Sequence, residues 1–154
     1  MGTLTLADLV KDRHSDELIV QPASASVADV VAVMADRDVG AVLVMNEDGL
    51  FSGIFTERDL LTRVVGDGRD PATTPLSLVM TREVKFVTPA TTTEAALALM
   101  HLHRFRHLLV IDGPVVLGLV SMRDLVVQMV RSGEGRYESA VRAAVAAGAG
   151  PCGA

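Results

Sequence analysis

Two short segments of the chain repeat the same order of residue types. GIFTERDLL occupies residues 53–61 and GLVSMRDLV occupies residues 118–126, 65 positions further along. Each begins with Gly, continues with two apolar residues and a hydroxyl residue, and reaches Arg-Asp before two more apolar residues. Such a repeat indicates two copies of one structural unit. Because a unit of about 60 residues is only marginally stable alone, the sequence predicts two copies packed against each other.

Each copy starts with a short apolar run that ends in proline, residues 18–22 and residues 84–89, which predicts a strand. A Ser- or Thr-rich stretch follows, and its hydroxyl groups suit the N-terminus of a helix. The next residues show the i, i+3, i+4, i+7 spacing of one helix face. The expected stripes are Val27, Val30, Val31 and Met34 in the first copy, and Ala96, Leu99, Met100 and His103 in the second.

Two β-rich runs and a second helix complete each copy. The links NEDG and DGP between the paired runs are turn-forming and predict hairpins. The order strand, helix, strand, strand, helix predicts an α+β fold, with two β-α-β-β-α motifs packed sheet to sheet in a pseudo-two-fold arrangement. The stripes expected in the closing helices are Leu60, Leu61, Val64 and Val65 in the first copy, and Leu125, Val126, Met129 and Val130 in the second.

Gly and Pro mark the boundary between the copies at residues 66–80, which predicts a linker. We expect the first motif, with an N-terminal helix, in residues 1–66, and the linker with the second motif in residues 67–132. The predicted N-terminal helix has a counterpart, TPLSLVM, before the second motif. Residues 133–154 are expected to hold a weak helix, from about residue 138 to residue 147, and a flexible tail.

Composition excludes several classes of protein. The net charge of −5 and the 3% content of aromatic residues disfavour binding to nucleic acid. The single cysteine, Cys152, cannot form an internal disulfide, which favours a reducing compartment. The N-terminus lacks the pattern of a secretory signal, and the longest apolar stretches are too short to span a bilayer. We therefore expect a cytoplasmic protein that does not interact with membranes.

The repeated motifs resemble those of the CBS domain, named after cystathionine β-synthase, and the pair resembles a stand-alone Bateman module. The resemblance covers residues 3–131 and depends on the two matching frameworks, with HLLV where the family often has an HLPV-like strand. It implies a regulatory, non-catalytic unit that requires no cofactor. Such units bind adenosine-containing ligands such as AMP, ADP, ATP, NAD or S-adenosylmethionine in clefts between the motifs. They commonly form homodimers and act on a regulated protein, which the sequence does not identify.

The hydroxyl and carboxylate residues of the repeat are candidate ligand contacts. Thr56 and Asp59 are three positions apart where a strand meets a helix, and Ser121 and Asp124 repeat this spacing. It is the spacing of a capping box, and a helix N-terminus also favours phosphate. An ionised Asp at this position can accept hydrogen bonds from ribose hydroxyls, and the resemblance assigns sugar contacts to both pairs. The alternative is that the residues only cap the two helices.

Basic residues are candidate phosphate contacts. Arg58 and Arg123 each precede the Asp of the motif and can bind phosphate bidentately. Arg106 and His107 stand at the start of a β-run, where the resemblance implies that basic residues face ligand phosphates. The corresponding residues of the first copy, 40–41, are neutral, so we expect two unequal clefts. The alternative is that Arg104 and Arg106 are solvated surface charges.

Catalysis and metal binding have little support in the sequence. We find no nucleophile–base set and no phosphate loop, so we do not expect an enzyme. His101 and His103 are two positions apart, on different helix faces, which is a poor spacing for a metal site. The alternative to a nucleotide sensor is a protein-interaction module whose clefts are vestigial and which does not depend on nucleotide.

Overall fold

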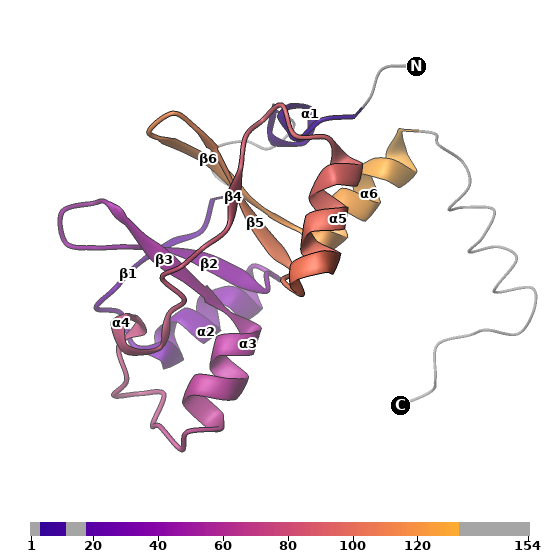
Figure 1. Ribbon diagram of the computed structural model, residues 1–154. Helices are drawn as coiled ribbons and strands as arrows, with labels where there is room; N and C mark the ends of the chain where they lie inside the picture. Colours follow the sequence, from indigo (N-terminus) through magenta and orange to yellow (C-terminus); the bar gives the residue numbers. More distant parts are fainter. Residues whose placement is uncertain (1–3, 12–17, 133–154) are drawn as a thin grey trace, which may run out of the picture.

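Two halves with the same order of elements make up residues 4–11 and 18–132, the part of the chain that the computed structural model describes (Figure 1). The helix predicted near residues 138–147, the tail and Cys152 lie outside these residues. The elements are α1 (Leu6–Lys11), β1 (Val20–Pro22), α2 (Val27–Asp36), β2 (Ala41–Met45), β3 (Phe51–Thr56), α3 (Glu57–Asp59), the π-helix η2 (Leu60–Val65), α4 (Leu76–Val79), β4 (Phe86–Val87), α5 (Thr93–His103), β5 (His107–Asp112), β6 (Val115–Ser121) and α6 (Met122–Arg131).

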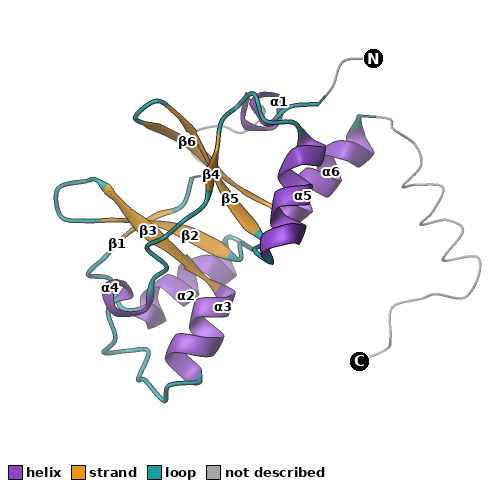
Figure 2. Ribbon diagram, viewed as in Figure 1, coloured by secondary structure: helices purple, strands orange, loops and turns teal. Residues whose placement is uncertain are grey.

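Each half contains a three-stranded sheet with the same topology (Figure 2). In the first sheet β1 runs parallel to β2, and β2 runs antiparallel to β3. In the second sheet β4, β5 and β6 repeat this arrangement. The register shifts at equivalent places, between Val44 and Met45 in β2 and between Val110 and Ile111 in β5. The prediction of two repeated α+β motifs is therefore confirmed.

Local hydrogen bonds explain where the helices and hairpins form. The hydroxyls of Ser26 and Thr92 accept from the backbone N–H three residues on, at 3.2 and 3.1 Å, and so cap α2 and α5 as predicted. In the β2–β3 turn, Asn46 Oδ1 accepts from two backbone N–H groups of the loop. Gly49 and Gly113 have φ of 73° and 56° in the two hairpin turns, a conformation that glycine adopts without strain.

The central strands are apolar on both faces because each face is buried against a different layer. In β2, Val42 and Val44 belong to the helix-side core of the first half, whereas Leu43 belongs to a separate cluster. Successive side chains of a strand point to opposite faces, so Leu43 faces the other sheet. There it shares a cluster with Ile54 of β3 and Leu109 of β5, all three no more than 6% exposed. The predicted sheet-to-sheet packing is thus confirmed.

The short helix that precedes each motif is buried in one of the two helix-side cores. Leu76 and Val79 of α4 pack with the residues of α2, β2 and β3 in the first half. Leu6 and Leu9 of α1 pack with those of α5, β5 and α6 in the second half. The backbone N–H of Leu6 also donates to the carbonyl of Thr91 at 2.9 Å. Each short helix therefore completes the core of the half that it does not precede.

The exchange of α1 and α4 between the two cores differs from the expectation that the N-terminal helix belongs with the first motif. Chain order places α1 next to the first half, but packing places it in the second. Residues 12–19 lie between α1 and β1, and eight residues can reach up to about 26 Å. The core contacts of Leu6 and Leu9, and not chain order, therefore place α1 in the second half.

Two of the predicted apolar stripes are wrong at particular positions. Leu61 and Val65 are 65% and 63% exposed, because the helix after α3 is a π-helix and not an α-helix. The N–H of Gly66 donates to the carbonyl of Leu61, five residues back, so the spacing of 3.6 residues per turn does not hold there. His103 is also exposed, and its ring stacks on that of Phe105 with 5.6 Å between the centroids.

A pair of leucine variants tests the packing of α4. We expect Leu76→Ala to lower the free energy of unfolding by about 2–5 kcal/mol, because Leu76 is fully buried and its removal leaves a cavity. Leu78 on the same helix is 63% exposed, so Leu78→Ala should cost no more than about 0.5 kcal/mol. Urea denaturation monitored by circular dichroism measures both changes. Equal costs would show that α4 does not complete the first core.

Candidate ligand-binding cleft

A cleft of about 240 Å³ lies between the two halves, with walls from both. The first half contributes residues at the starts of β1 and β2, and the second contributes residues of β5, β6 and α6. Its volume is slightly below the range of about 300–1,000 Å³ that is typical of small-molecule sites. The cleft therefore suits a small ligand that contacts both halves.

One end of the cleft is apolar and the other is polar. Leu18, Leu43 and Leu119 are among the residues of the apolar end, close to the contact between the sheets. Ser121 follows two residues after Leu119 in β6, so it lies about 6–7 Å further along the strand. The start of β2 at Ala41 is displaced from Leu43 in the same way. A ligand with one apolar and one polar part matches this arrangement.

Ser121 and Asp124 form the polar end where β6 meets α6. Asp124 Oδ2 accepts from the backbone N–H and the hydroxyl of Ser121, both at 2.7 Å. The backbone N–H of Asp124 donates back to Ser121 Oγ at 3.1 Å, which completes a capping box. Both side chains are partly buried and line the cleft, together with the exposed side chain of Arg123. The N-terminus of a ten-residue helix thus borders the cleft with a carboxylate and a guanidinium.

His107 lines the cleft beside this capping box. It is the first residue of β5 and is the register partner of Ser121 in β6. Burial lowers the pKa of the imidazole below its ordinary value of 6.5, although the carboxylates of Asp124 and Glu57 act in the opposite direction. Arg106 adds a smaller effect that lowers this pKa further. His107 is therefore neutral at pH 7 and can both donate and accept hydrogen bonds.

The lowered pKa of His107 makes stability depend on pH. The unfolded chain binds a proton near pH 6.5, more readily than the folded chain does, so stability rises with pH in this range. We expect the melting temperature to fall as the pH drops from about 7.5 to about 5.5, and the fall to be smaller in His107→Gln. His101→Gln on the exposed side of α5 is the matched control. Identical pH profiles for the wild type and His107→Gln would contradict this role.

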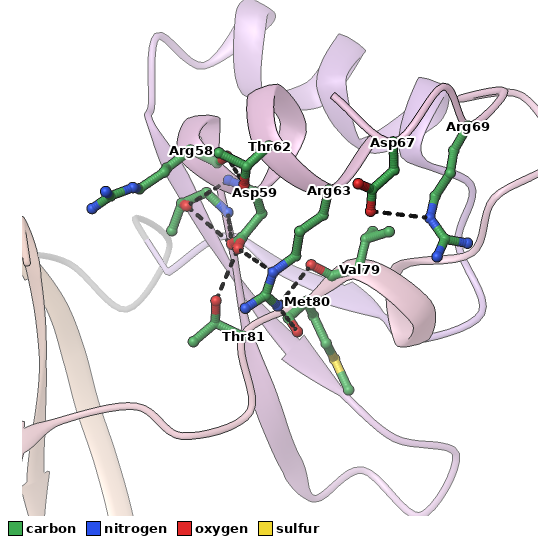
Figure 3. A network of polar contacts seen from close by, with 10 residues as sticks. Arg58, Asp59, Thr62, Arg63, Asp67, Arg69, Val79, Met80 and Thr81 are labelled. Atoms are coloured by element: carbon green, nitrogen blue, oxygen red, sulfur yellow. Dashed lines mark hydrogen bonds and ion pairs between the residues drawn. The ribbon is translucent and has the colours of Figure 1, made fainter. Parts of the chain in front are cut away.

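The equivalent pair in the first half, Thr56 and Asp59, forms a buried network. Asp59 is only 5% exposed. Its Oδ2 accepts from the backbone N–H and the hydroxyl of Thr56, both at 3.0 Å. Its Oδ1 accepts from the Thr81 hydroxyl at 2.9 Å and lies 3.6 Å from Arg63 Nε (Figure 3). Both carboxylate oxygens of Asp59 are thus engaged by the chain itself.

This network holds the linker against the first half. Arg63 donates to the backbone carbonyls of Val79 and Met80, at 3.3 and 2.7 Å, at the C-terminal end of α4. The backbone of Thr81 pairs with that of Ile54 in β3 through two hydrogen bonds of 2.9 and 2.8 Å. A Cβ atom on Gly53 would lie 2.4 Å from the Thr81 carbonyl oxygen, so only glycine permits this approach. Asp59 therefore acts as an anchor for the linker.

The structure places the eight predicted site residues in three settings. His107, Ser121, Arg123 and Asp124 line the cleft, whereas Thr56 and Asp59 belong to the linker network. Arg58 and Arg106 are exposed and are not among the cleft walls, and Arg58 points away from the network in Figure 3.

Sequence reasoning missed Asp38 and treated residues 40–41 only as neutral counterparts, although all three line the cleft. The signal for Asp38 was its position before a predicted strand, opposite in charge to Arg104 in the second copy.

The hydroxyl of Thr81 offers a direct test of the linker anchor. Thr81→Val removes the hydrogen bond to Asp59 at nearly constant volume, and we expect it to lower the free energy of unfolding by about 1–3 kcal/mol. Thr73→Val, at an exposed position of the same linker, should change it by less than about 0.5 kcal/mol. Chemical denaturation measures both. An equal effect of the two variants would show that the Thr81 contact does not stabilise the fold.

Metal sites and membrane spans are absent from the described part of the chain. Over residues 4–11 and 18–132, no group of three or more His, Cys, Asp or Glu side chains is placed to hold a metal ion. None of the helices within these ranges is both long enough and apolar enough to cross a bilayer.

The sequence matches the family model of the CBS domain twice, over residues 10–66 and residues 76–131. It is 31% identical to the CBS domain-containing protein YhcV of Bacillus subtilis, over 79% of this chain and 85% of that protein. It is 35% identical to the CBS domain-containing protein CBSCBSPB3 of Arabidopsis thaliana, over 88% of this chain. The matched region spans only 25% of that plant protein's length.

Solved structures show the same arrangement of elements. A CBS-domain-containing protein from Agrobacterium tumefaciens superposes with a TM-score of 0.74 at 31% identity, over 82% of this chain and 94% of that one. A hexameric CBS-CP12 protein from bloom-forming cyanobacteria superposes with a TM-score of 0.69 at 26% identity, over 93% of this chain and 85% of that one.

Proposed function

This chain belongs to the CBS domain family, and from that premise we propose that it senses an adenosine-containing ligand, which it binds in the cleft between its two halves. The observation that carries the proposal is the combination of an apolar end and a polar end in one cleft, with Ser121 and Asp124 at a helix N-terminus. No cofactor is required for this role. The adenosine ligand itself is the regulatory signal.

The cleft supplies a separate contact for each part of such a ligand. The leucine side chains of the apolar end match the faces of a purine base. The carboxylate of Asp124 is an acceptor for sugar hydroxyls, and hydrogen bonds to an ionised group are the stronger kind. The guanidinium of Arg123 and the neutral ring of His107 supply further donors. These contacts support the proposal of a nucleoside-like ligand.

The chemistry of the cleft favours binding over catalysis. The Ser121 hydroxyl donates to Asp124 Oδ2 and accepts from the Asp124 backbone N–H. It therefore serves as a helix cap and is not held as a nucleophile activated by the neighbouring His107. We assign no enzymatic activity to this cleft.

Signalling requires that the ligand change an interaction of the protein. A ligand that contacts both halves favours the arrangement of the halves that it binds best. Leu61 and Val65 on η2 and Val127 on α6 expose apolar surface, which is typical of interaction sites. The hexameric state of the cyanobacterial relative supports self-association. We therefore assign the output to a homodimer interface, or to a regulated protein that binds the same helices.

Thermal shift measurements test ligand binding. AMP, ADP, ATP, NAD, adenosine and S-adenosylmethionine are tested on the wild type, on Asp124→Asn and on Asp112→Asn, an exposed control outside the cleft. A ligand at about 100 times its Kd adds about 2.7 kcal/mol to stability. For a chain of this size the melting temperature should rise by about 5–10 °C. We expect Asp124→Asn to lose most of this rise and Asp112→Asn to keep it.

Two outcomes would contradict the proposal in different ways. If no compound of the panel raises the melting temperature, the chain is not an adenosine sensor, and the interaction module with vestigial clefts becomes the better description. If the rise is undiminished in Asp124→Asn, the ligand binds outside this cleft.

A further inference from the structure

A strip of α6 has an apolar surface that no described core covers. Its described walls, which we call the α6 strip, are Met122, Arg123, Val126, Val127, Val130 and Arg131. All six come from this one helix, so the described residues supply one wall of the hollow and not the wall that faces it. The three valines are absent from the described core clusters, and Val127 is 37% exposed. The α6 strip therefore suits an amphipathic segment that lies along the helix.

Arginines border the α6 strip at both ends. Arg123 stands in the first turn of α6 and Arg131 is its last residue. Both side chains are exposed, and neither forms an ion pair with another residue of the described ranges. A segment that brings negative charge to the two ends is therefore favoured as the occupant.

The chain continues from this point with a segment whose composition fits the α6 strip. α6 is the last described element (Figure 1), and residues 133–154 follow it directly. Residues 138–147, ESAVRAAVAA, are rich in alanine, which has the highest helix propensity. Apolar residues recur there at i, i+4, i+7 and i+8, the spacing of one helix face, at Tyr137, Val141, Ala144 and Val145. The sequence of this segment therefore favours an amphipathic helix.

Length and charge favour an antiparallel arrangement of this segment on α6. Both α6 and residues 138–147 comprise ten residues, and a helix of that length spans about 15 Å. The intervening residues 132–137 contain two glycines and have a length typical of helix–helix connections. With the chain reversed, Glu138 comes next to Arg131. The C-terminal end of the second helix, which carries partial negative charge, comes next to Arg123.

A tethered segment matches the α6 strip better than a separate molecule does. Six residues form the described walls, whereas a stable interface between separate proteins takes about 20–30 residues on each side. A segment joined by a short connection has an effective concentration of about millimolar, so it needs few contacts to bind. A ten-residue helix is marginal in water by itself, and packing of its apolar face supplies the missing stability.

We propose that residues 138–147 fold back as a helix antiparallel to α6 and cover the α6 strip of the same chain. This docking does not depend on which ligand the cleft binds. It places the segment on the α6 part of the surface that the proposed function assigns to a second copy or a regulated protein. Such a partner must then displace the segment from Val127.

A matched pair of variants in the full-length chain tests the docking by hydrogen exchange and mass spectrometry. Ala144→Asp places a charge on the apolar face of the segment, whereas Ala143→Asp makes the same change on the opposite face. In the wild type, we expect residues 138–147 to exchange at least about tenfold more slowly than in a synthetic peptide of residues 133–154. Ala144→Asp should lose this protection and Ala143→Asp should keep most of it. Circular dichroism checks that both variants are folded.

The single cysteine, Cys152, carries a nitroxide label that shows which chain the segment covers. We expect the label to broaden the methyl NMR signals of Val126 and Val127 in its own chain, and Ala144→Asp to abolish the broadening. Labelled chains mixed with unlabelled, isotopically enriched chains should show none. Broadening in this mixture would assign the α6 strip to the segment of a second copy and overturn the proposal. Unprotected exchange of residues 138–147 in the wild type, or equal effects of the two alanine variants, would also overturn it.

Discussion

The apolar contact between the two sheets is the interaction on which the rest of the structure depends. Each half has about 60 residues and would be only marginally stable alone, and the cluster of Leu43, Ile54 and Leu109 joins the halves. Because the central strands are buried on both faces, their polar groups are confined to the strand ends. The cleft between the halves lies where this contact ends, with apolar walls on the inside and charged residues at the rim.

The same sequence motif serves different purposes in the two halves. Thr56 and Asp59 are buried and connect the linker to the first half through Thr81 and Arg63. Ser121 and Asp124 form the same capping box but remain partly exposed and line the cleft. A motif that appears twice is therefore not evidence of two equivalent ligand sites, and the surroundings of each copy decide its use.

Much of the fold was predictable, because the repeat, the capping hydroxyls and the alternating apolar residues act locally. Four of the eight predicted site residues line the cleft, three of them at the motif where β6 meets α6. The burial of Asp59 and the position of Asp38 in the cleft wall were not predictable, because both depend on which distant segment lies alongside. The exposure of Leu61 and Val65 was missed because nothing in the sequence distinguishes a π-helix from an α-helix there.

The exchange of α1 and α4 has a consequence for synthesis of the chain on the ribosome. The first half has all of its core residues once Met80 has emerged, because α4 and the residue after it supply the last of them. The apolar side chains of α1 are made before those of the other described elements, but they meet their last partner, Leu125 on α6, only after residue 125. During elongation Leu6 and Leu9 remain without their native core, and contacts between such distant segments form slowly. Helix α1 is thus translated before the other described elements and is among the last of them to be buried.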